Sequence, residues 1–309
     1  MMSTTNILDS IGRTPLVELR RVVQTGWARV LVKLEGANPT GNMKDRMAKA
    51  AIEAAEADGR LKSGGTVVEY TGGSTGASLA LVCAAKGYRL KIVTSDAFSE
   101  EKILTMQALG AEIILVASED RKITQDLISR MIGKARQIAE EPGHWWFDQL
   151  NNKDASAGYY QMGEEIWAQT DGNVHAVVQA VGSAHSLNGV ASVLRRHKPD
   201  LHVVAAEPAE SAVLSGQPKG AHRIEGIGIG SIPPHWRAET IDEIISATSE
   251  EASRMCRRLA REEGILAGTS SGLNVIAALR VAERLGPDAT VATIMIDSGL
   301  RYLSTDLYR

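Results

Sequence analysis

The sequence is poor in cysteine and in aromatic side chains. Among its 309 residues there are only two cysteines, Cys83 and Cys256, and the aromatic residues make up 4%. Two cysteines cannot form a disulfide framework, and no Cys or Cys/His cluster has the spacing of a zinc site, so we expect a reducing compartment and no metal. Few aromatics together with 29 glycines favour helices packed closely on a sheet over an all-β sandwich.

The chain also lacks long apolar runs and an excess of charge of one sign. No segment approaches the roughly 18 apolar residues of a membrane span, and the N-terminus has no signal-peptide pattern, so we predict a cytoplasmic protein. The 34 basic and 37 acidic residues give a net charge of -3, which offers no electrostatic footprint for nucleic acid. The length predicts about two domains.

Strand-like and helix-like segments alternate along the chain. Segments rich in β-branched or aromatic residues begin near residues 29, 66, 89, 111, 144, 175, 202 and 290, and helical periodicity fills most of the intervals. One long helix is predicted through Ile123, Leu127, Met131 and Ile138. Residues 211–236, rich in Gly and Pro, are predicted to form a functional loop. The alternation predicts an α/β protein with parallel sheets and two layered halves.

Three turns between an expected strand and an expected helix are rich in glycine and serine. They are TGGSTG at 71–76, VGSAHS at 181–186 and GTSSG at 268–272. Such turns gather where ligands bind in parallel sheets, and the N–H groups of a helix start suit a carboxylate or phosphate. We expect small anionic ligands at the first two. GIGIGS at 226–231 lacks the last glycine of the dinucleotide fingerprint, so a dinucleotide is disfavoured.

These turns also have other interpretations. Ser183 or Ser186 fits an ordinary helix N-cap equally well. Gly72, Ser74 and Gly76 satisfy the G-x-S-x-G pattern of serine hydrolases, with Ser74 as the nucleophile, although no HGGG-type oxyanion loop precedes them. A serine hydrolase is therefore a remote alternative.

Lys44 follows a Gly-containing loop and opens an expected helix. The helix dipole there disfavours a positive charge and lowers the pKa of the amine, which favours a nucleophile. A lone lysine is nearly always a solvated surface charge, so Lys44 by itself does not indicate a catalytic residue without the surrounding motifs.

Taken together, the motifs resemble one known family. NPTGNMKDR at 38–46, TGGSTG, the turn at Gly182, GIGIGSIP at 226–233 and DSGLRYLST at 297–305 occur in the order and approximate spacing of the cysteine synthase (O-acetylserine sulfhydrylase) and cystathionine β-synthase family. The resemblance runs from residue 11 to residue 308. These are fold-type II enzymes that use pyridoxal 5'-phosphate.

The resemblance implies a fold and a domain division. The fold has two open, twisted, mostly parallel sheets flanked by helices, as in tryptophan synthase β-like proteins. Residues 46–150 would form a smaller, mobile domain, and residues 1–45 with 151–309 a larger one. The cofactor would lie in the cleft between them.

The resemblance also implies roles for particular residues. Lys44 would bind the cofactor covalently and act as the catalytic base, and Ser270 would hydrogen-bond the pyridine nitrogen. The phosphate would be held by Gly182, Ser183, Ala184, His185 and Ser186. The substrate carboxylate would be bound by Thr71, Gly72, Gly73, Ser74 and Thr75, completed by Gln149, with Gly226 and Gly228 facing the substrate's amino group. Ser74 would also contact the cofactor.

The implied reaction is β-replacement on an O-activated L-serine, in which O-acetylserine and sulfide give L-cysteine through an α-aminoacrylate intermediate. Related enzymes use another donor or nucleophile, with O-phosphoserine, cystathionine or diaminopropionate formation, or serine and threonine deamination, as alternatives. A further alternative is a pseudoenzyme that binds the cofactor without turnover. The family is commonly homodimeric, and some members bind the tail of serine acetyltransferase.

Three positions depart from the family pattern at the expected site. Ser74 stands where the family usually has Asn, which puts the substrate preference in doubt. Ala184 and His185 replace two glycines of the usual phosphate turn. His185 could pair with the phosphate, point into the substrate channel or pack against other residues, and the sequence does not decide among these.

Overall fold

A computed structural model describes residues 6–309, which divide into two compact units. Of the described residues, the first unit holds 6–11 and Lys44–Gly158, and the second holds Gly12–Met43 and Tyr159–Arg309. The segment before Gly12 belongs to the first unit because Leu8 is buried and Lys49 Nζ donates to Leu8 O at 3.1 Å. The sequence assigned this segment to the larger domain. The mobility of the smaller domain and the place of the cofactor between the two domains stay predictions.

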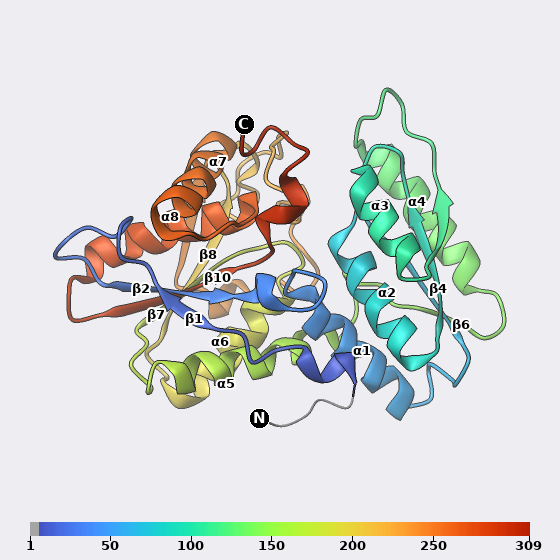
Figure 1. Ribbon diagram of the computed structural model, residues 1–309, viewed down its shortest axis with the longest axis horizontal. Helices are drawn as coiled ribbons and strands as arrows, with labels where there is room; N and C mark the ends of the chain where they lie inside the picture. The colour runs from blue at the N-terminus through green and yellow to red at the C-terminus, as the bar shows by residue number, and fades with distance from the viewer. Residues whose placement is uncertain (1–5) are drawn as a thin grey trace. The chain divides into compact units, whose positions relative to one another are not determined.

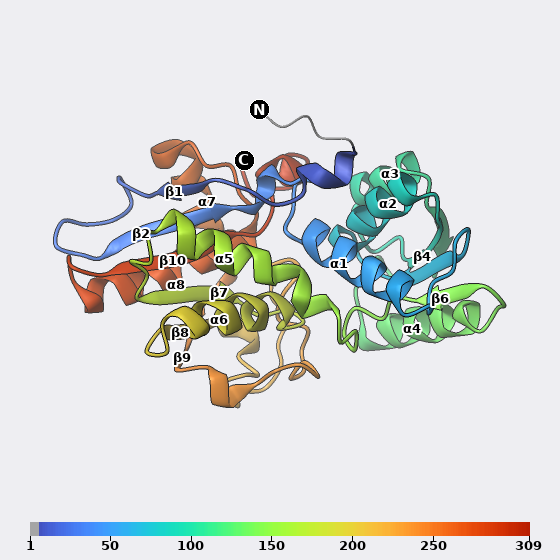
Figure 2. The same cartoon turned by 90° about the horizontal axis from the view of Figure 1, so that it is seen from below.

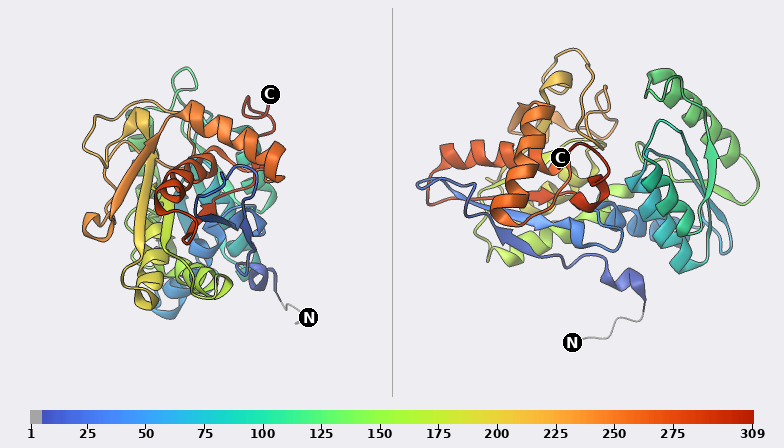
Figure 3. Two further views of the ribbon diagram at one scale, coloured as in Figure 1. Left: turned by 90° about the vertical axis from the view of Figure 1, so that its left-hand side faces the viewer. Right: turned by 45° about the horizontal axis from the view of Figure 1, so that its top comes forward.

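The first unit is built on a four-stranded parallel sheet with helices on both faces (Figure 1). The sheet order is β5-β4-β3-β6. Its strands are β3 (Thr66–Tyr70), β4 (Arg89–Thr94), β5 (Glu112–Leu115) and β6 (His144–Trp146). Its helices are α1 (Lys44–Ala57), α2 (Ser74–Lys86), α3 (Glu100–Ala108) and α4 (Gln125–Ala139). Figure 3 shows α4 on one side of this sheet and α2 and α3 on the other.

Helix α4 begins two residues later than the apolar pattern predicts. Thr124 is its N-cap, and the Thr124 hydroxyl accepts a hydrogen bond from Leu127 N at 3.1 Å. Ile123 therefore precedes the helix and is 58% exposed, so its predicted place on the buried helix face is wrong. Leu127 and Met131 are buried against Val68 and Val93 of the sheet, as the pattern predicts.

The second unit contains a six-stranded sheet in the order β1-β2-β10-β7-β8-β9. Its strands are β1 (Leu16–Glu18), β2 (Arg29–Leu34), β7 (Ala176–Ala180), β8 (His202–Pro208), β9 (Glu243–Ala247) and β10 (Thr290–Met295). Its helices are α5 (Tyr160–Gln169), α6 (His185–His197), α7 (Ser249–Arg258) and α8 (Thr269–Leu285). Figure 2 shows α5 and α6 together on one side of the sheet, and α7 and α8 pack together on the other (Figure 1).

All neighbouring strands of the two sheets run parallel except β1, which pairs antiparallel with β2. The predicted α/β class with two mostly parallel sheets flanked by helices is confirmed. Residues 212–237 carry no helix or strand, in agreement with the predicted loop. Within residues 6–309, none of the helices combines the length and apolarity that crossing a bilayer requires.

Candidate functional site

Three helices begin at the glycine- and serine-rich turns without a capping side chain. Gly73 precedes α2, Ala184 precedes α6 and Gly268 precedes α8, and none of these N-caps accepts a hydrogen bond from its helix through a side chain. In contrast, Thr124 and Thr248 cap α4 and α7 with their hydroxyls. The first N–H groups of α2, α6 and α8 have no partner within their own helix, which makes each start suited to an anion.

The first unit brings together the predicted carboxylate-binding residues. Thr75 Oγ1 donates a short hydrogen bond to Gln149 Oε1, so the start of α2 is tied to the segment after β6. Thr71 N donates to Val93 O at 3.0 Å, and Gly73 N donates to Thr71 Oγ1 at 3.1 Å. The predicted association of Gln149 with the 71–75 turn is thus present in the structure, while its role in binding substrate stays a prediction.

Two glycines of this turn are required by their surroundings. A Cβ on Gly72 would overlap the ring of Phe98, and a Cβ on Gly73 would overlap the side chain of Lys102. Gly73 also has a φ of 155°, a conformation that residues with a Cβ rarely adopt. The chain just before and within α3 therefore packs directly on the turn and fixes its shape.

Lys44 is the first residue of α1 and is half-buried. The residue after it is also fixed, because Ser78 Oγ of α2 donates to Asp45 Oδ1 at 2.6 Å. On the other side, Met43 N donates to Ile296 O at 2.9 Å. The lysine is thus presented from a helix start that is held at both neighbouring residues, as a side chain with a defined task requires.

The second unit places the predicted phosphate turn against the Gly226–Gly228 loop. Gly228 N donates to Val181 O at 3.1 Å, and a Cβ on Gly182 would lie 2.6 Å from Gly226 O. Ala184 has a φ of 68°, the left-handed conformation that the glycine usual in the family would adopt without strain. The two loops are therefore in direct backbone contact.

Further contacts hold this loop on both sides. The His222 Nδ1 accepts from Ile224 N at 3.2 Å, so its Nε2 donates to Gly228 O at 2.9 Å. Glu225 N donates to Thr269 Oγ1 at 3.2 Å, next to the buried Ser270 at the start of α8. The structure thus brings the phosphate turn, the Gly226–Gly228 loop and the Ser270 helix start into one network. This contact of His222 with the loop was not predicted from the sequence.

His185 is fully buried and packs on a second histidine. The ring centroids of His185 and His235 are 4.5 Å apart, and Asn188 Nδ2 donates to His235 O at 2.7 Å. Packing on His235 is thus present, while a role of His185 toward the phosphate or in the substrate channel stays a prediction. Gln179, which sequence reasoning missed, lies fully buried on β7 and donates through Nε2 to Ser186 Oγ at 2.6 Å.

Glu69 is a second residue that the sequence did not single out. It lies on β3, is fully buried, and accepts a backbone hydrogen bond from Gln149. Burial raises the pKa of Glu69 to about 8, against the lowering effect of hydrogen bonds from the backbone of Gln149 and Tyr70. The signal was present as one acid in the β-rich run TVVEYT at 66–71.

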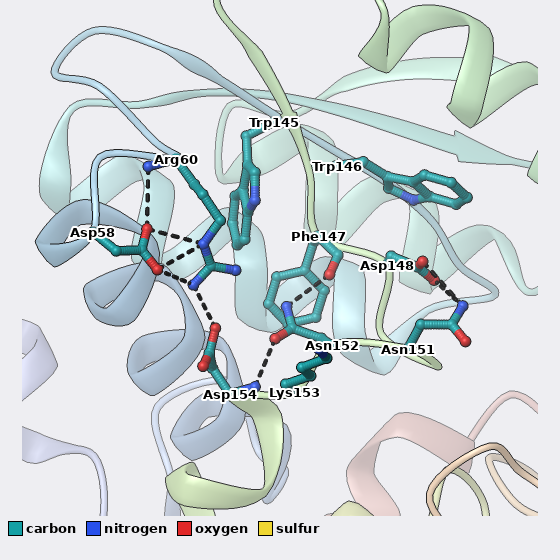
Figure 4. Close-up of a pocket in the computed structure, with 10 residues that line it drawn as sticks. All are labelled: Asp58, Arg60, Trp145, Trp146, Phe147, Asp148, Asn151, Asn152, Lys153 and Asp154. Carbon is teal, nitrogen blue, oxygen red and sulfur yellow. Dashed lines mark hydrogen bonds and ion pairs between the residues drawn. The ribbon is translucent and has the colours of Figure 1, made fainter.

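A cavity lies beside this segment and is not lined by the predicted site residues (Figure 4). It has a volume of ≈ 480 Å³. Its lining residues are Asp58, Arg60, Trp145, Trp146, Phe147, Asp148, Asn151, Asn152, Lys153 and Asp154. Arg60 lies over the Trp145 ring and pairs with Asp58 and Asp154, so its guanidinium is engaged by the protein itself.

The two cysteines are buried in different units and are both free thiols. Burial raises the pKa of each thiol to about 12, so neither is a nucleophile at neutral pH.

Comparisons with known proteins cover almost the whole chain. The family described as pyridoxal-phosphate dependent enzyme matches residues 7–297. A cysteine synthase of Staphylococcus aureus (strain Mu50 / ATCC 700699) is 42% identical over 306 residues, which are 98% of this chain and 96% of the relative. The crystal structure of a cysteine synthase (OASS) from Entamoeba histolytica has a TM-score of 0.93 at 39% identity, covering 99% of this chain and 91% of that one. An O-acetylserine dependent cystathionine β-synthase from Helicobacter pylori has a TM-score of 0.92 at 35% identity, covering all of both chains.

Proposed function

The chain belongs to the family of pyridoxal-phosphate dependent enzymes, and on that premise we propose that it is a cysteine synthase-like enzyme. It would perform β-replacement on an O-activated L-serine, most simply turning O-acetylserine and sulfide into L-cysteine. The observation that carries the proposal is the hydrogen-bonded pair of Thr75 and Gln149 at the uncapped start of α2, which suits the carboxylate of an amino acid.

The residues present fit pyridoxal 5'-phosphate. The start of α6 has no capping side chain, and the approach of Gly226 O to Gly182 leaves room there for backbone alone. Backbone N–H groups at such a turn suit a phosphate dianion. Gly182, Ser183, Ala184, His185 and Ser186 would hold the phosphate, Lys44 would bind the aldehyde carbon, and Ser270 would face the ring nitrogen.

The bound cofactor supplies an electron sink for the bonds at Cα of an amino acid. Lys44 would hold the cofactor, and its free amine would accept the Cα proton of the substrate. The Ser270 hydroxyl is neutral, so it would favour an unprotonated ring nitrogen and prompt loss of the leaving group from Cβ. The carboxylate would be held by Thr71, Gly72, Gly73, Ser74 and Thr75 with Gln149, while Gly226 and Gly228 face the amino group.

Formation of cystathionine is a second candidate function, supported by the full-length similarity to the Helicobacter pylori enzyme. It differs from the first only in the nucleophile that attacks Cβ. O-Phosphoserine, diaminopropionate formation and deamination remain alternatives at the same site. The hydrolase alternative based on Ser74 has no support from the family match.

One absorbance titration tests the proposal. Protein purified with pyridoxal 5'-phosphate should absorb in the visible, change its band on addition of O-acetylserine and recover it on addition of sulfide, with L-cysteine as product. Replacing sulfide by homocysteine tests the second candidate. A loaded protein that does not respond to O-acetylserine would contradict the proposed donor.

Lys44→Ala is expected to abolish turnover and the covalent link to the cofactor while leaving the fold intact. Lys49→Ala, five residues along α1, is the matched control, since Lys49 Nζ donates only to Leu8 O among the hydrogen bonds described for it. A fully active Lys44→Ala protein would overturn the role of Lys44.

Assembly and location extend the same proposal. We infer a homodimer in the cytoplasm, on the basis of the resemblance to cysteine synthases, and a complex with the C-terminal tail of serine acetyltransferase. Sedimentation of the loaded protein, alone and with a peptide of that tail, measures both associations. A monomer at micromolar concentration would contradict the dimer.

A further inference from the structure

Glu69 has a fully buried carboxyl group whose two oxygens each face a backbone N–H group. Oε1 accepts from Tyr70 N at 2.8 Å, and Oε2 accepts from Gln149 N at 2.9 Å. The first contact is local, whereas the second spans 80 residues of the chain. Glu69 therefore links the end of β3 to the segment that carries Gln149.

This link begins where the pairing of β3 with β6 ends. The register of these strands runs from Thr66 with His144 to Val68 with Trp146, and the last backbone bond joins Phe147 N to Val68 O at 2.9 Å. Beyond that point the Glu69 side chain supplies the acceptor that the neighbouring strand no longer provides. The segment can then turn at Asp148, whose φ is 47°, and still be held at the next residue.

The residue held in this way is the one whose side chain reaches α2. Gln149 Oε1 accepts a hydrogen bond from the hydroxyl of Thr75, and Thr75 is itself buried at the start of that helix. An amide whose oxygen is engaged with a donor presents its NH2 group on the other side. An NH2 group donates hydrogen bonds, and a carboxylate ligand accepts them. The placement of the Gln149 backbone thus determines where that donor lies.

Burial of a carboxyl group is unfavourable at this position, and the two backbone hydrogen bonds that Glu69 accepts explain why an acid is found there. Burial raises the pKa of Glu69 to about 8, and the nearby Asp148 raises it further, while the two N–H groups lower it. Burying an ionisable group costs free energy, so a neutral side chain would be favoured here if it could make the same contacts. A glutamine of the same size would turn its NH2 group toward one of the two N–H groups, leaving that donor unpaired.

We propose that Glu69 is a positioning residue for the substrate carboxylate, acting through Gln149 by fixing its backbone beside the start of α2. The proposal rests on the proposed function in one respect, that Gln149 binds this carboxylate. Its structural half, the restraint on the Gln149 backbone, is independent of the reaction.

The structural half is tested by amide hydrogen exchange on the loaded protein. Glu69→Gln should speed exchange of the Gln149 N–H by roughly tenfold, because the hydrogen bond from this N–H to the side chain of residue 69 is weakened or lost. Glu263→Gln is the matched control, since Glu263 also accepts backbone hydrogen bonds from a distant segment, at Arg20, Arg21 and Val22. Equal exchange of Gln149 in the wild type and Glu69→Gln would overturn the proposal. Should Glu69→Gln not fold, Glu69→Asp, one methylene shorter, replaces it.

The functional half is tested by a double-mutant cycle on O-acetylserine. Glu69→Gln should raise KM by roughly tenfold with kcat and cofactor affinity little changed, whereas in a Gln149→Ala background the same change should alter KM less than about twofold. Equal effects in both backgrounds would show a merely structural role and overturn the proposal.

The two failures are distinguishable. If the wild type ignores O-acetylserine, the proposed function fails, and the exchange experiment still decides the restraint on Gln149. If the wild type turns over O-acetylserine and the cycle is additive, the inference alone fails.

Discussion

Replacing Glu69 with glutamine should change how the stability of the protein depends on pH. The pKa of this carboxyl is about 8 in the folded protein, mainly because burial disfavours the charge, against an ordinary value of 4.5. A folded-state pKa above the unfolded-state value favours folding most where both states are protonated. The contribution is therefore fully present below about pH 4.5 and is lost as the pH rises to about 8.

The size of this effect follows from the same values. A shift of about 3.5 pKa units at roughly 1.4 kcal/mol each corresponds to about 5 kcal/mol of unfolding free energy lost between pH 4.5 and pH 8. Glutamine does not titrate, so it removes this dependence, whatever constant penalty its NH2 group adds. The quantity to compare is the difference in unfolding free energy between Glu69→Gln and the wild type at each pH.

Urea unfolding followed by circular dichroism at intervals from pH 4.5 to pH 9 measures that difference. It should rise in favour of the variant by several kcal/mol and level off above pH 8. Titrating groups that do not interact with Glu69 are common to both proteins and cancel. A difference that stays constant across this range would refute the assignment of a raised pKa to Glu69.

Three other substitutions test features of the two turns and the α8 start. Ala184→Gly should stabilise the protein by up to about 1 kcal/mol, because it removes the cost of a left-handed alanine at some expense in unfolded-state entropy; a lower urea midpoint would contradict this. Gly72→Ala should destabilise by about 1–3 kcal/mol through overlap with Phe98, and adding Phe98→Ala should restore part of the loss. Ser270→Asp should shift the absorbance of the bound cofactor and slow elimination, and an unchanged spectrum would argue that Ser270 does not face the ring nitrogen.

The alternation of strands and helices was sufficient to predict the α/β class, because buried parallel strands carry continuous apolar runs. Strand β9 was not predicted, since its residues Glu243–Ala247 lie at a sheet edge and are only partly buried. Strand β1 has three residues and gains its structure by pairing with β2. The extent of α4 was misjudged at Ile123 because a threonine cap outweighs one apolar residue in phase with the helix.

The candidate site was predictable where motifs are local in sequence. Lys44, the 71–76 turn and the 181–186 turn each lie at a strand-to-helix junction, and their helix starts follow from the pattern. Contacts between distant segments were not predictable without a fold. The packing of His185 on His235 and the hydrogen bond from Gln149 N to Glu69 depend on which segments become neighbours in the fold.

The position of β10 in its sheet also bears on the order in which the chain can fold during synthesis. β10 is formed by residues 290–295 and lies between β2, near the start of the chain, and β7. The parallel neighbour of the early strand β2 is therefore synthesised only after almost the entire chain. The first unit, whose sheet is complete by Trp146, needs no such delay. Nascent chains halted before Thr290 should show a protease-resistant first unit and an unprotected β2, because long-range pairing cannot precede its partner.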